Sequence, residues 1–240
     1  KYKCIMNTKK FTVIADVVIF TVIIAVFSVC FIPKRAITIT GGKAYSAIYH
    51  GKRGSDKIAL TFNVYEGTEI VNGILDVLKT RGAKGTFFVG GCWADDNAET
   101  LKRIISEGHE LGNHGFFHKD HKKLTESGNY REITDAENAI LAATGYKTVL
   151  FAPPSGSYSK ATLKAACDLG YKTIMWTKDT IDWRDSDEKL IIKRAASGIA
   201  GGDIVLMHPK KHTLSALGKI LDKITAAGLK AVTVSECCEF

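Results

Sequence analysis

The sequence predicts an α/β fold in which parallel strands form a distorted (β/α) barrel. Three observations support this prediction: short apolar segments recur along the chain, longer amphipathic segments separate them, and Gly or polar residues follow most of the apolar segments. Alternating strand and helix patterns are typical of βα units with parallel strands. About seven such units in roughly 180 residues favour a barrel, complete or incomplete, over an open doubly wound sheet.

The expected strands are short runs rich in β-branched and aromatic residues. They cover residues 58–62, 85–89, 110–113, 148–151, 173–176, 204–207 and 231–234. The clearest helical patterns cover residues 70–80, 98–107 after a capping Asn97, 187–197 and 215–227. In a parallel barrel the functional site lies at the carboxyl ends of the strands, so reactive residues should follow the strands directly.

The first 33 residues have the pattern of a membrane anchor. Residues 1–10 contain four lysines and no acid, and residues 11–32 are almost continuously apolar, with Asp16 as the single charge. A helix of about 20 apolar residues spans the hydrocarbon core of a bilayer. A cleaved signal peptide is the alternative, but the apolar run is long for one and no small-x-small cleavage site precedes Pro33.

We therefore predict four regions: a cytoplasmic basic tail at 1–10, a transmembrane helix at 11–33, a linker or stalk at 34–56, and a catalytic-type domain at 57–240. The lysines on the amino-terminal side place the tail in the cytosol by the positive-inside rule. The linker is rich in Gly, Thr, Ser and Lys and is short of periodic hydrophobicity, which is typical of a stalk or of a loose first hairpin. The predicted location is the cell membrane, single-pass, with the carboxyl-terminal domain on the extracytoplasmic side.

The distribution of charge argues against a nucleic-acid partner. The chain carries 33 Lys and Arg against 25 Asp and Glu, a net charge of +8. Six basic residues and one acid lie in residues 1–35, which leaves +3 for the remainder. Most of the basic excess is therefore an orientation signal for the anchor. The mildly basic remainder is compatible with anionic wall polymers and gives no case for nucleic acid.

Two histidines after the third expected strand have a spacing that suits a metal site. His114 and His118 are four residues apart, which on a helical turn puts both imidazoles on one face. Two neutral imidazoles with a carboxylate suit zinc or a similar divalent ion. The spacing is frequent by chance, but its position at a strand end favours a metal. We interpret His121, among lysines, as solvated surface, and His109 as belonging to the opposite barrel end.

The sixth expected strand leads directly to His208. There an imidazole must be satisfied by hydrogen bonds or act as an acid or base. Asp182, after a neighbouring strand, could orient His208 and favour its protonated form, as a general acid requires. A core histidine is the alternative for His208 taken alone. Trp183 is expected to form a wall of the cleft, with a core role as the alternative, and His50 and His212 receive no role.

Five motifs in this order resemble the NodB-type polysaccharide deacetylase family. They are TFNVYEG at 61–67, ELGNHGFFH at 110–118, FAPPSG at 151–156, DTIDW at 179–183 and GDIVLMH at 202–208. The resemblance covers about residues 57–238 and is greatest to a sporulation-associated, PdaB-like branch of Gram-positive bacteria. It implies a distorted (β/α) barrel, the NodB homology domain, which binds a divalent metal, zinc with cobalt or manganese as alternatives. The implied reaction removes acetyl groups from N-acetylglucosamine or N-acetylmuramic acid in glycans such as peptidoglycan or chitin.

The resemblance also implies roles for individual residues. It assigns the metal ligands to His114 and His118, the general acid to His208, the residue that tunes it to Asp182, and one wall of the groove to Pro153, Pro154 and Gly156. In the family, metal-bound water attacks the amide carbonyl, an Asp of the first motif acts as base, and the His of the last motif protonates the leaving amine. The metal and a backbone N–H stabilise the oxyanion.

The chain departs from the family pattern at three positions. Asn63 and Val64 stand where the first motif has its base Asp and a metal-binding Asp, and Ala152 replaces the Arg that orients the base. A carboxamide cannot accept the proton from water near neutral pH, and valine cannot bind a metal, so these changes describe one altered site. Glu66 and Glu69 are candidate substitute bases or ligands, with solvated loop charge as the alternative for each.

Two functions from different classes follow from these motifs. The first is a membrane-anchored, metal-dependent de-N-acetylase of cell-wall glycan, which hydrolyses a carbon–nitrogen amide bond with a modified base. The second is a degenerate deacetylase that keeps a metal or sugar-binding groove and acts as a cell-wall binding protein. Another metallohydrolase on a similar barrel is a third alternative. The expected partners are cell-wall glycan and the membrane.

Overall fold

The computed structural model describes residues 45–240. The basic tail predicted at 1–10 and the transmembrane helix predicted at 11–33 lie outside the described residues and stay predictions. Within residues 45–240, no helix has the length and apolar character needed to cross a membrane.

Within residues 45–240, nine strands, parallel in every pair, form the wall of the barrel. They are β1 (Ala47–Ile48), β2 (Lys57–Val64), β3 (Thr86–Val89), β4 (Glu110–Asn113), β5 (Leu150–Phe151), β6 (Lys172–Ile174), β7 (Lys178–Asp179), β8 (Ile204–Met207) and β9 (Lys230–Val232). Their order is β1-β6-β5-β4-β3-β2-β8-β7, and β9 pairs with the start of β2. Among the described residues no pairing joins β1 to β7, so the barrel is distorted and open, as the sequence allowed.

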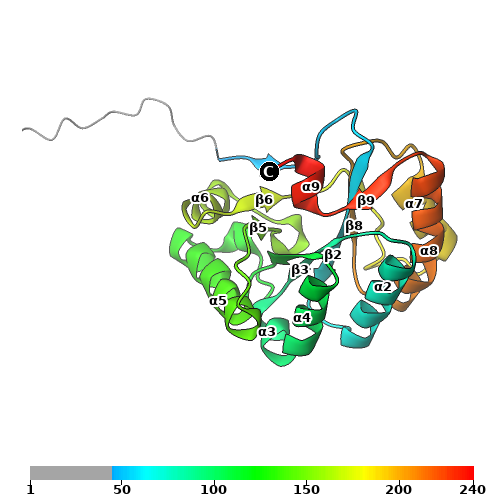
Figure 1. The fold of residues 1–240 in the computed structure, drawn as a ribbon. Helices are drawn as coiled ribbons and strands as arrows, with labels where there is room; N and C mark the ends of the chain where they lie inside the picture. Colours follow the sequence, from blue (N-terminus) through cyan, green and yellow to red (C-terminus); the bar gives the residue numbers. More distant parts are fainter. Residues whose placement is uncertain (1–44) are drawn as a thin grey trace, which may run out of the picture. The chain divides into compact units, whose positions relative to one another are not determined.

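Helices cover the outside of this wall, with α2, α7 and α8 along one side and α3, α4 and α5 along another (Figure 1). They are α2 (Thr68–Thr80), α3 (Gly91–Asp96), α4 (Ala98–Ser106), α5 (Glu126–Thr144), α6 (Lys160–Asp168), α7 (Glu188–Ala196), α8 (Lys211–Ala226) and α9 (Val234–Cys238), with short 3-10 turns η1 (His121–Lys123) and η2 (Pro154–Gly156). All seven expected strands and the four expected helices are present, and α8 begins earlier than the predicted residue 215. The strands β1 and β7 were not expected.

Residues 45–56, the described part of the linker or stalk expected at 34–56, belong to the barrel, whereas residues 34–44 lie outside the described residues. Ala47 in β1 pairs with Thr173 in β6. The backbone N–H of Gly51 donates to the carbonyl oxygen of Gly202 at 2.7 Å. A Cβ at Gly51 would lie 2.4 Å from the carbonyl oxygen of Cys237, so only glycine fits there. These partners lie far away in the sequence, and local composition therefore could not reveal them.

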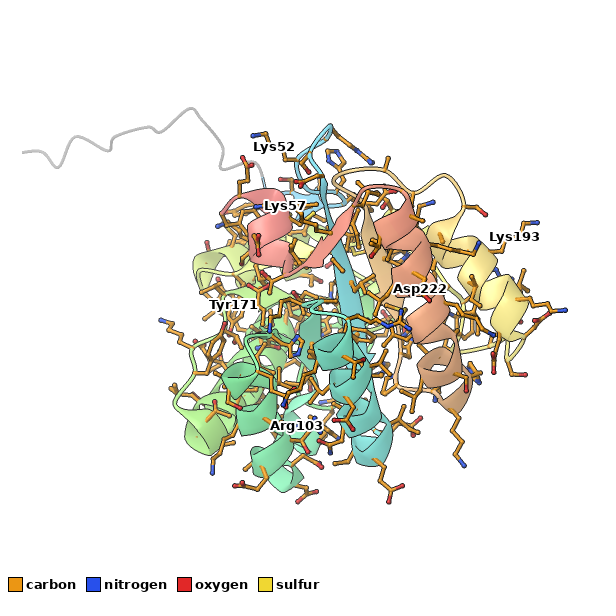
Figure 2. All side chains as sticks on the ribbon, turned by 45° about the vertical axis from the view of Figure 1, so that its right-hand side comes forward. Lys52, Lys57, Arg103, Tyr171, Lys193 and Asp222 are labelled. Atoms are coloured by element: carbon orange, nitrogen blue, oxygen red, sulfur yellow. The ribbon has the colours of Figure 1, made fainter. Side chains whose placement is uncertain are left out.

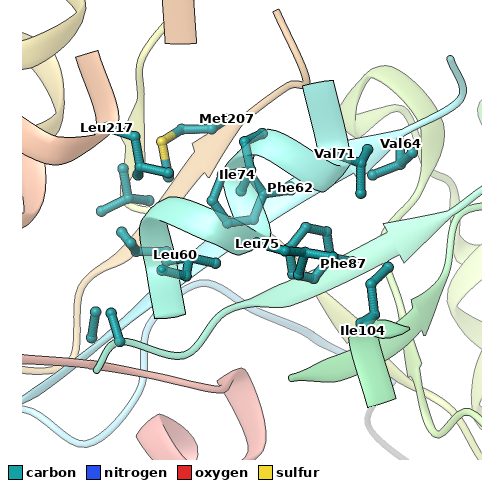
Figure 3. Packing of buried hydrophobic residues seen from close by; sticks show 14 of the residues in the cluster. Leu60, Phe62, Val64, Val71, Ile74, Leu75, Phe87, Ile104, Met207 and Leu217 are labelled. Atoms are coloured by element: carbon teal, nitrogen blue, oxygen red, sulfur yellow. The ribbon is translucent and has the colours of Figure 1, made fainter. Parts of the chain in front are cut away.

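The strand β2 sorts its side chains alternately into two layers, as the pleat of a strand requires. One set, Ile58, Leu60, Phe62 and Val64, joins the large apolar cluster between the sheet and the helices. Figure 3 shows Phe62 and Val64 close to Val71 and Ile74 of α2. The other set, Ala59, Thr61 and Asn63, faces the barrel interior, where the Thr61 hydroxyl donates to the Val205 carbonyl at 3.0 Å. Burial of each large apolar side chain stabilises the fold by roughly 1.5–3 kcal/mol.

His109 lies at the amino end of β4, at the barrel end opposite the strand carboxyl ends, as predicted. Its ring is buried, and its Nδ1 accepts a hydrogen bond from the backbone N–H of Gly85 at 3.2 Å. Burial lowers the pKa of His109 from 6.5 to about 4, with a further contribution from the positive charge of Lys84. His109 is therefore neutral in the folded protein at neutral pH.

We predict that His109 makes the protein less stable in mild acid. In the unfolded chain His109 has its ordinary pKa of 6.5 and binds a proton below that pH, whereas in the folded protein it binds one only near pH 4. The free energy of unfolding therefore falls as the pH drops from 6.5 to about 4. His109→Asn keeps an acceptor for Gly85 but cannot be protonated. The loss of unfolding free energy between pH 7 and pH 4.5, measured with urea, should shrink by roughly 2 kcal/mol. The exposed variant His50→Asn is the control, and an unchanged pH dependence in His109→Asn would contradict the prediction.

Candidate functional site

A cavity of about 540 Å³ lies at the carboxyl ends of the strands. Its walls come from the ends of the strands, from the loops after β2, β4, β6, β7 and β8, and from η2. The lining residues are Asn63, Tyr65, Glu66, His114, His118, Ser155, Trp176, Asp179, Trp183, Leu206, His208, Pro209 and Lys210. Reactive side chains from separate motifs therefore meet at one place, as the fold class predicted.

Asp182 and His208 form a closely hydrogen-bonded pair at this cavity. The Nδ1–H of His208 donates to Asp182 Oδ1 at 2.7 Å, and the backbone N–H of His208 donates to Oδ2 at 2.7 Å. The Thr213 hydroxyl also donates to Oδ2, at 2.6 Å. Because Nδ1 is engaged, Nε2 is the nitrogen of His208 that is free to exchange a proton with a bound molecule.

The environment of Asp182 keeps its carboxylate charged. Burial alone would raise the pKa of Asp182, but the hydrogen bond and charge of His208 and the hydrogen bond of Thr213 outweigh burial and hold the pKa below its ordinary value. A charged carboxylate at this place fixes the orientation of the imidazole. The arrangement agrees with the predicted pairing of the two residues.

Two residues that support this pair come from the start of α8, and sequence reasoning missed them. One is Thr213, and the other is His212, whose Nε2–H donates to the Asp182 carbonyl oxygen at 2.7 Å. Both residues follow His208 within five positions, and this closeness in the sequence was the signal that could have indicated their role.

His114 and His118 come together through a loop and not through the helical turn that their spacing suggested. Their rings lie 5.1 Å apart, centroid to centroid. Gly115 and His118 both have positive φ, at 71° and 54°. The Nδ1–H of His114 donates to the Ala152 carbonyl at 2.7 Å, which leaves Nε2 as the free nitrogen.

Both imidazoles are neutral at neutral pH. Burial, with the nearby charge of His118, lowers the pKa of His114 to about 3. His118 is exposed, yet partial loss of its hydration lowers its pKa below the ordinary value. Neutral imidazoles have the free lone pairs that a metal ion or a hydrogen-bond donor needs.

The loop between these histidines is held by Glu132 of α5, a residue that the motifs did not reveal. Its Oε2 accepts the backbone N–H groups of Phe116 and Phe117 at 3.0 and 2.8 Å. Its Oε1 pairs with Lys119 at 2.9 Å. The buried carboxylate therefore fixes the backbone that leads to His118.

His121 is buried, so its interpretation as solvated surface was wrong. Its Nδ1–H donates to Asn129 Oδ1 at 2.8 Å, and its ring lies 5.1 Å from that of Phe151. The lysines beside it face solvent while the imidazole turns inward against α5 and β5. Desolvation lowers its pKa.

The base position of the first motif holds a carboxamide in a poor setting for proton transfer. Asn63 is 6% exposed, and its Oδ1 is buried without a hydrogen-bond partner among the described residues. Glu66 lines the cavity but pairs with Lys210 at 2.6 Å. The hydrogen bond from Lys210 lowers the pKa of Glu66, which makes it a weaker base, in line with the loop-charge alternative.

The wall formed by η2 differs in detail from the prediction. Ser155, at a φ of 56°, lines the cavity, whereas Pro153 and Pro154 are buried behind it. Gly156 makes room for Trp176, because a Cβ there would lie 2.6 Å from the indole. Trp183 lines the cavity with 56% of its surface exposed, so it is not a core residue.

Comparisons with known sequences agree with this geometry. A family model described as polysaccharide deacetylase matches residues 50–174. The chain is 37% identical over 190 residues to an uncharacterised protein of Bacillus subtilis, YlxY, covering 79% of this chain and 59% of that protein. It is 34% identical over 181 residues to the peptidoglycan-N-acetylglucosamine deacetylase PgdA of Listeria monocytogenes, covering 75% of this chain and 38% of that enzyme. The chain thus spans less than two thirds of either relative.

Among solved structures, the chain resembles BA3943 of Bacillus anthracis, described as a CE4 family pseudoenzyme. The TM-score is 0.79 at 36% identity, covering 81% of this chain and 69% of that one. A mutant of BA3943 described as having restored enzymatic activity gives a TM-score of 0.78 at 34% identity, with 81% and 72% coverage. The chain belongs to the polysaccharide deacetylase family, whose enzymes are hydrolases acting on carbon–nitrogen bonds.

Deacetylases of this family generally depend on a divalent metal, and the residues of this chain match such a site only in part. His114 and His118 offer two imidazoles. Val64, where the family has a carboxylate ligand, points into the apolar cluster beneath α2. Among residues 45–240, no three His, Cys, Asp or Glu side chains are grouped to hold a metal. The donor set is incomplete for a tightly bound ion.

We predict that Asn63→Asp strengthens zinc binding. The variant adds a carboxylate to the cavity that holds both imidazoles, so the zinc affinity of the protein, measured by calorimetric titration, should rise at least about tenfold. Glu66→Gln is the control and should leave the affinity unchanged, because Lys210 already holds that carboxylate. Adding His114→Ala should remove the gain. An affinity equal to that of the natural protein would contradict the prediction.

Proposed function

We propose that this chain binds N-acetylated cell-wall glycan in the cavity and hydrolyses its amide bond slowly or not at all. The observation that carries this proposal is that, among the described residues, every carboxylate at the cavity that could act as the base already has a hydrogen-bond or ion-pair partner. Asn63 occupies the base position, Glu66 is paired with Lys210, and Asp179, the other lining carboxylate, accepts the backbone N–H of Ile181 at 2.8 Å. Asp182 is fully engaged by His208 and Thr213.

The lining of the cavity supports sugar binding. Tyr65, Trp176 and Trp183 contribute aromatic surface, and Asn63 and His208 contribute polar groups. A concave site with mostly apolar walls and a few placed polar groups is typical of small-ligand recognition. The Asn63 Oδ1 is buried, so its amide N–H₂ is the part of this side chain that can meet a ligand carbonyl. An acetamide group presents such a carbonyl.

The relatives support the class of ligand. PgdA of Listeria monocytogenes is named for action on N-acetylglucosamine in peptidoglycan. BA3943 is described as a pseudoenzyme, so loss of hydrolysis on this fold has a precedent.

A second candidate is a slow, metal-dependent de-N-acetylase, and the intact Asp182–His208 pair favours it. In this role Asp182 would hold the imidazole while His208 Nε2 donates a proton to the leaving amine. A bound metal would supply the activated water. His114 and His118 would hold that metal, which we expect to be zinc, with cobalt or manganese as alternatives.

The cellular setting is a further part of the proposal. We infer from the apolar run at 11–33 that the protein is anchored in the cell membrane with the barrel outside, and from the motifs that it belongs to the sporulation-associated branch. Recovery in the membrane fraction after an alkaline wash, with the barrel open to protease on intact protoplasts, would support the anchor. Recovery in the soluble fraction would refute it.

We predict that Trp183→Ala weakens glycan binding. The side chain lines the cavity and is 56% exposed, so its removal takes away contact surface without opening the core. The dissociation constant for an oligomer of N-acetylglucosamine, measured by calorimetry, should rise about tenfold. Phe240→Ala, an exposed aromatic outside the cavity, is the matched control. Unchanged affinity in Trp183→Ala, with the fold intact, would place the glycan elsewhere.

A further inference from the structure

A lysine-lined groove lies on the outer surface between α7 and α8. It has a volume of about 730 Å³. Lys189 and Lys193 of α7 stand on one side, and Lys219 and Lys223 of α8 stand on the other. We call these four residues the lysine groove. Because α8 begins beside the cavity at Lys211, the groove residues on its second half lie away from the glycan site.

The positive charge of the lysine groove is not neutralised within the described part of the chain. None of its four lysines has a carboxylate within ion-pair distance there, although 16 ion pairs of Lys or Arg form elsewhere in that part. The acid between the α8 lysines, Asp222, pairs instead with Arg81. Figure 2 shows Lys193 at the outer edge of the molecule, on α7.

The other acids near α7 also leave the groove uncompensated. Asp187 caps the helix by accepting the backbone N–H groups of Lys189 and Leu190. Asp185 pairs with Arg184 and Arg194. Glu188 does not line the groove. Four unpaired ammonium groups around one depression create a local positive potential that attracts anions.

The spacing of the four lysines suits a chain of repeated anionic groups. On each helix the two lysines are four residues apart, which is about 6 Å along the axis and on one face. The groove is also lined by Ile192 and by small residues such as Ala196 and Ala226. Ammonium groups are good donors to phosphate, and these apolar lining residues can contact the carbon units between phosphates.

We propose that the lysine groove binds a linear polyol-phosphate polymer, in which phosphodiester groups alternate with short carbon units. A bilayer surface fits less well, because the lysines flank a concave depression. Single-stranded nucleic acid also fits less well, because no aromatic side chain lines the groove to stack with bases. This site is independent of the glycan cavity and of whether that cavity hydrolyses its ligand.

The test is a fluorescence anisotropy titration of the protein with a labelled oligomer of glycerol phosphate. The double variant Lys193→Gln, Lys223→Gln should weaken binding about tenfold or more, and the slope of log K against log salt should fall by roughly 1.5. Lys147→Gln, Lys160→Gln removes the same charge from exposed lysines outside the groove and should change neither quantity. The variant Trp183→Ala should bind the polymer normally.

Three results would overturn the assignment. One is the absence of saturable binding by the natural protein at low salt. Another is equal affinity in the groove variant and the natural protein. The third is equal or stronger binding of oligouridylate or of phosphatidylglycerol vesicles, which would show a different anionic partner. Thermal melting of each variant shows whether the fold is intact.

Discussion

The alternation of side chains along β2 is the constraint on which the site depends. Phe62 and Val64 must face the helices, so that Asn63 alone at this strand end faces the cavity. The parallel partners β3 and β8 hold this register by pairing with Asn63 and Phe62. Val64 is thus a packed core residue and not only a missing ligand. A carboxylate at position 64 could face the cavity only if the backbone at the end of β2 took a different path. In the present backbone it would be a buried charge among apolar side chains.

The site keeps one half of a hydrolytic arrangement and lacks the other. Asp182 accepts three hydrogen bonds and orients His208, and the donors come from the residue after β8 and from the start of α8. At the end of the neighbouring strand β2, Asn63 stands at the base position, and Ala152, in place of an arginine, is buried in the barrel interior. Asn63 and Ala152 thus stand at the positions that would activate the attacking water. The aromatic residues proposed to contact the sugar, Tyr65, Trp176 and Trp183, still line the cavity.

The sequence predicted the strands and the main site because both depend on local pattern. His114, His118, Asp182, Trp183 and His208 each stand in a motif after a strand, and parallel topology brings strand ends together. Contacts with side chains from distant helices could not be predicted from the sequence. Glu132 binds the 115–119 loop, and His212 donates to the Asp182 carbonyl, only once the chain has folded. The neighbours of His121 are charged, which suggested exposure, but its contact with Asn129 depends on how α5 packs.

Acetate release from N-acetylated peptidoglycan, measured by NMR with zinc at stoichiometric concentration, tests the central claim most directly. The natural protein should bind the glycan and release acetate near the uncatalysed rate, because Asn63 stands at the base position and the carboxylates described at the cavity are already paired. Asn63→Asp should release acetate at least about a hundredfold faster, since a positioned general base contributes typically 10²–10⁴-fold. Release by the natural protein at an enzyme-like rate, unchanged in Asn63→Asp, would contradict the account.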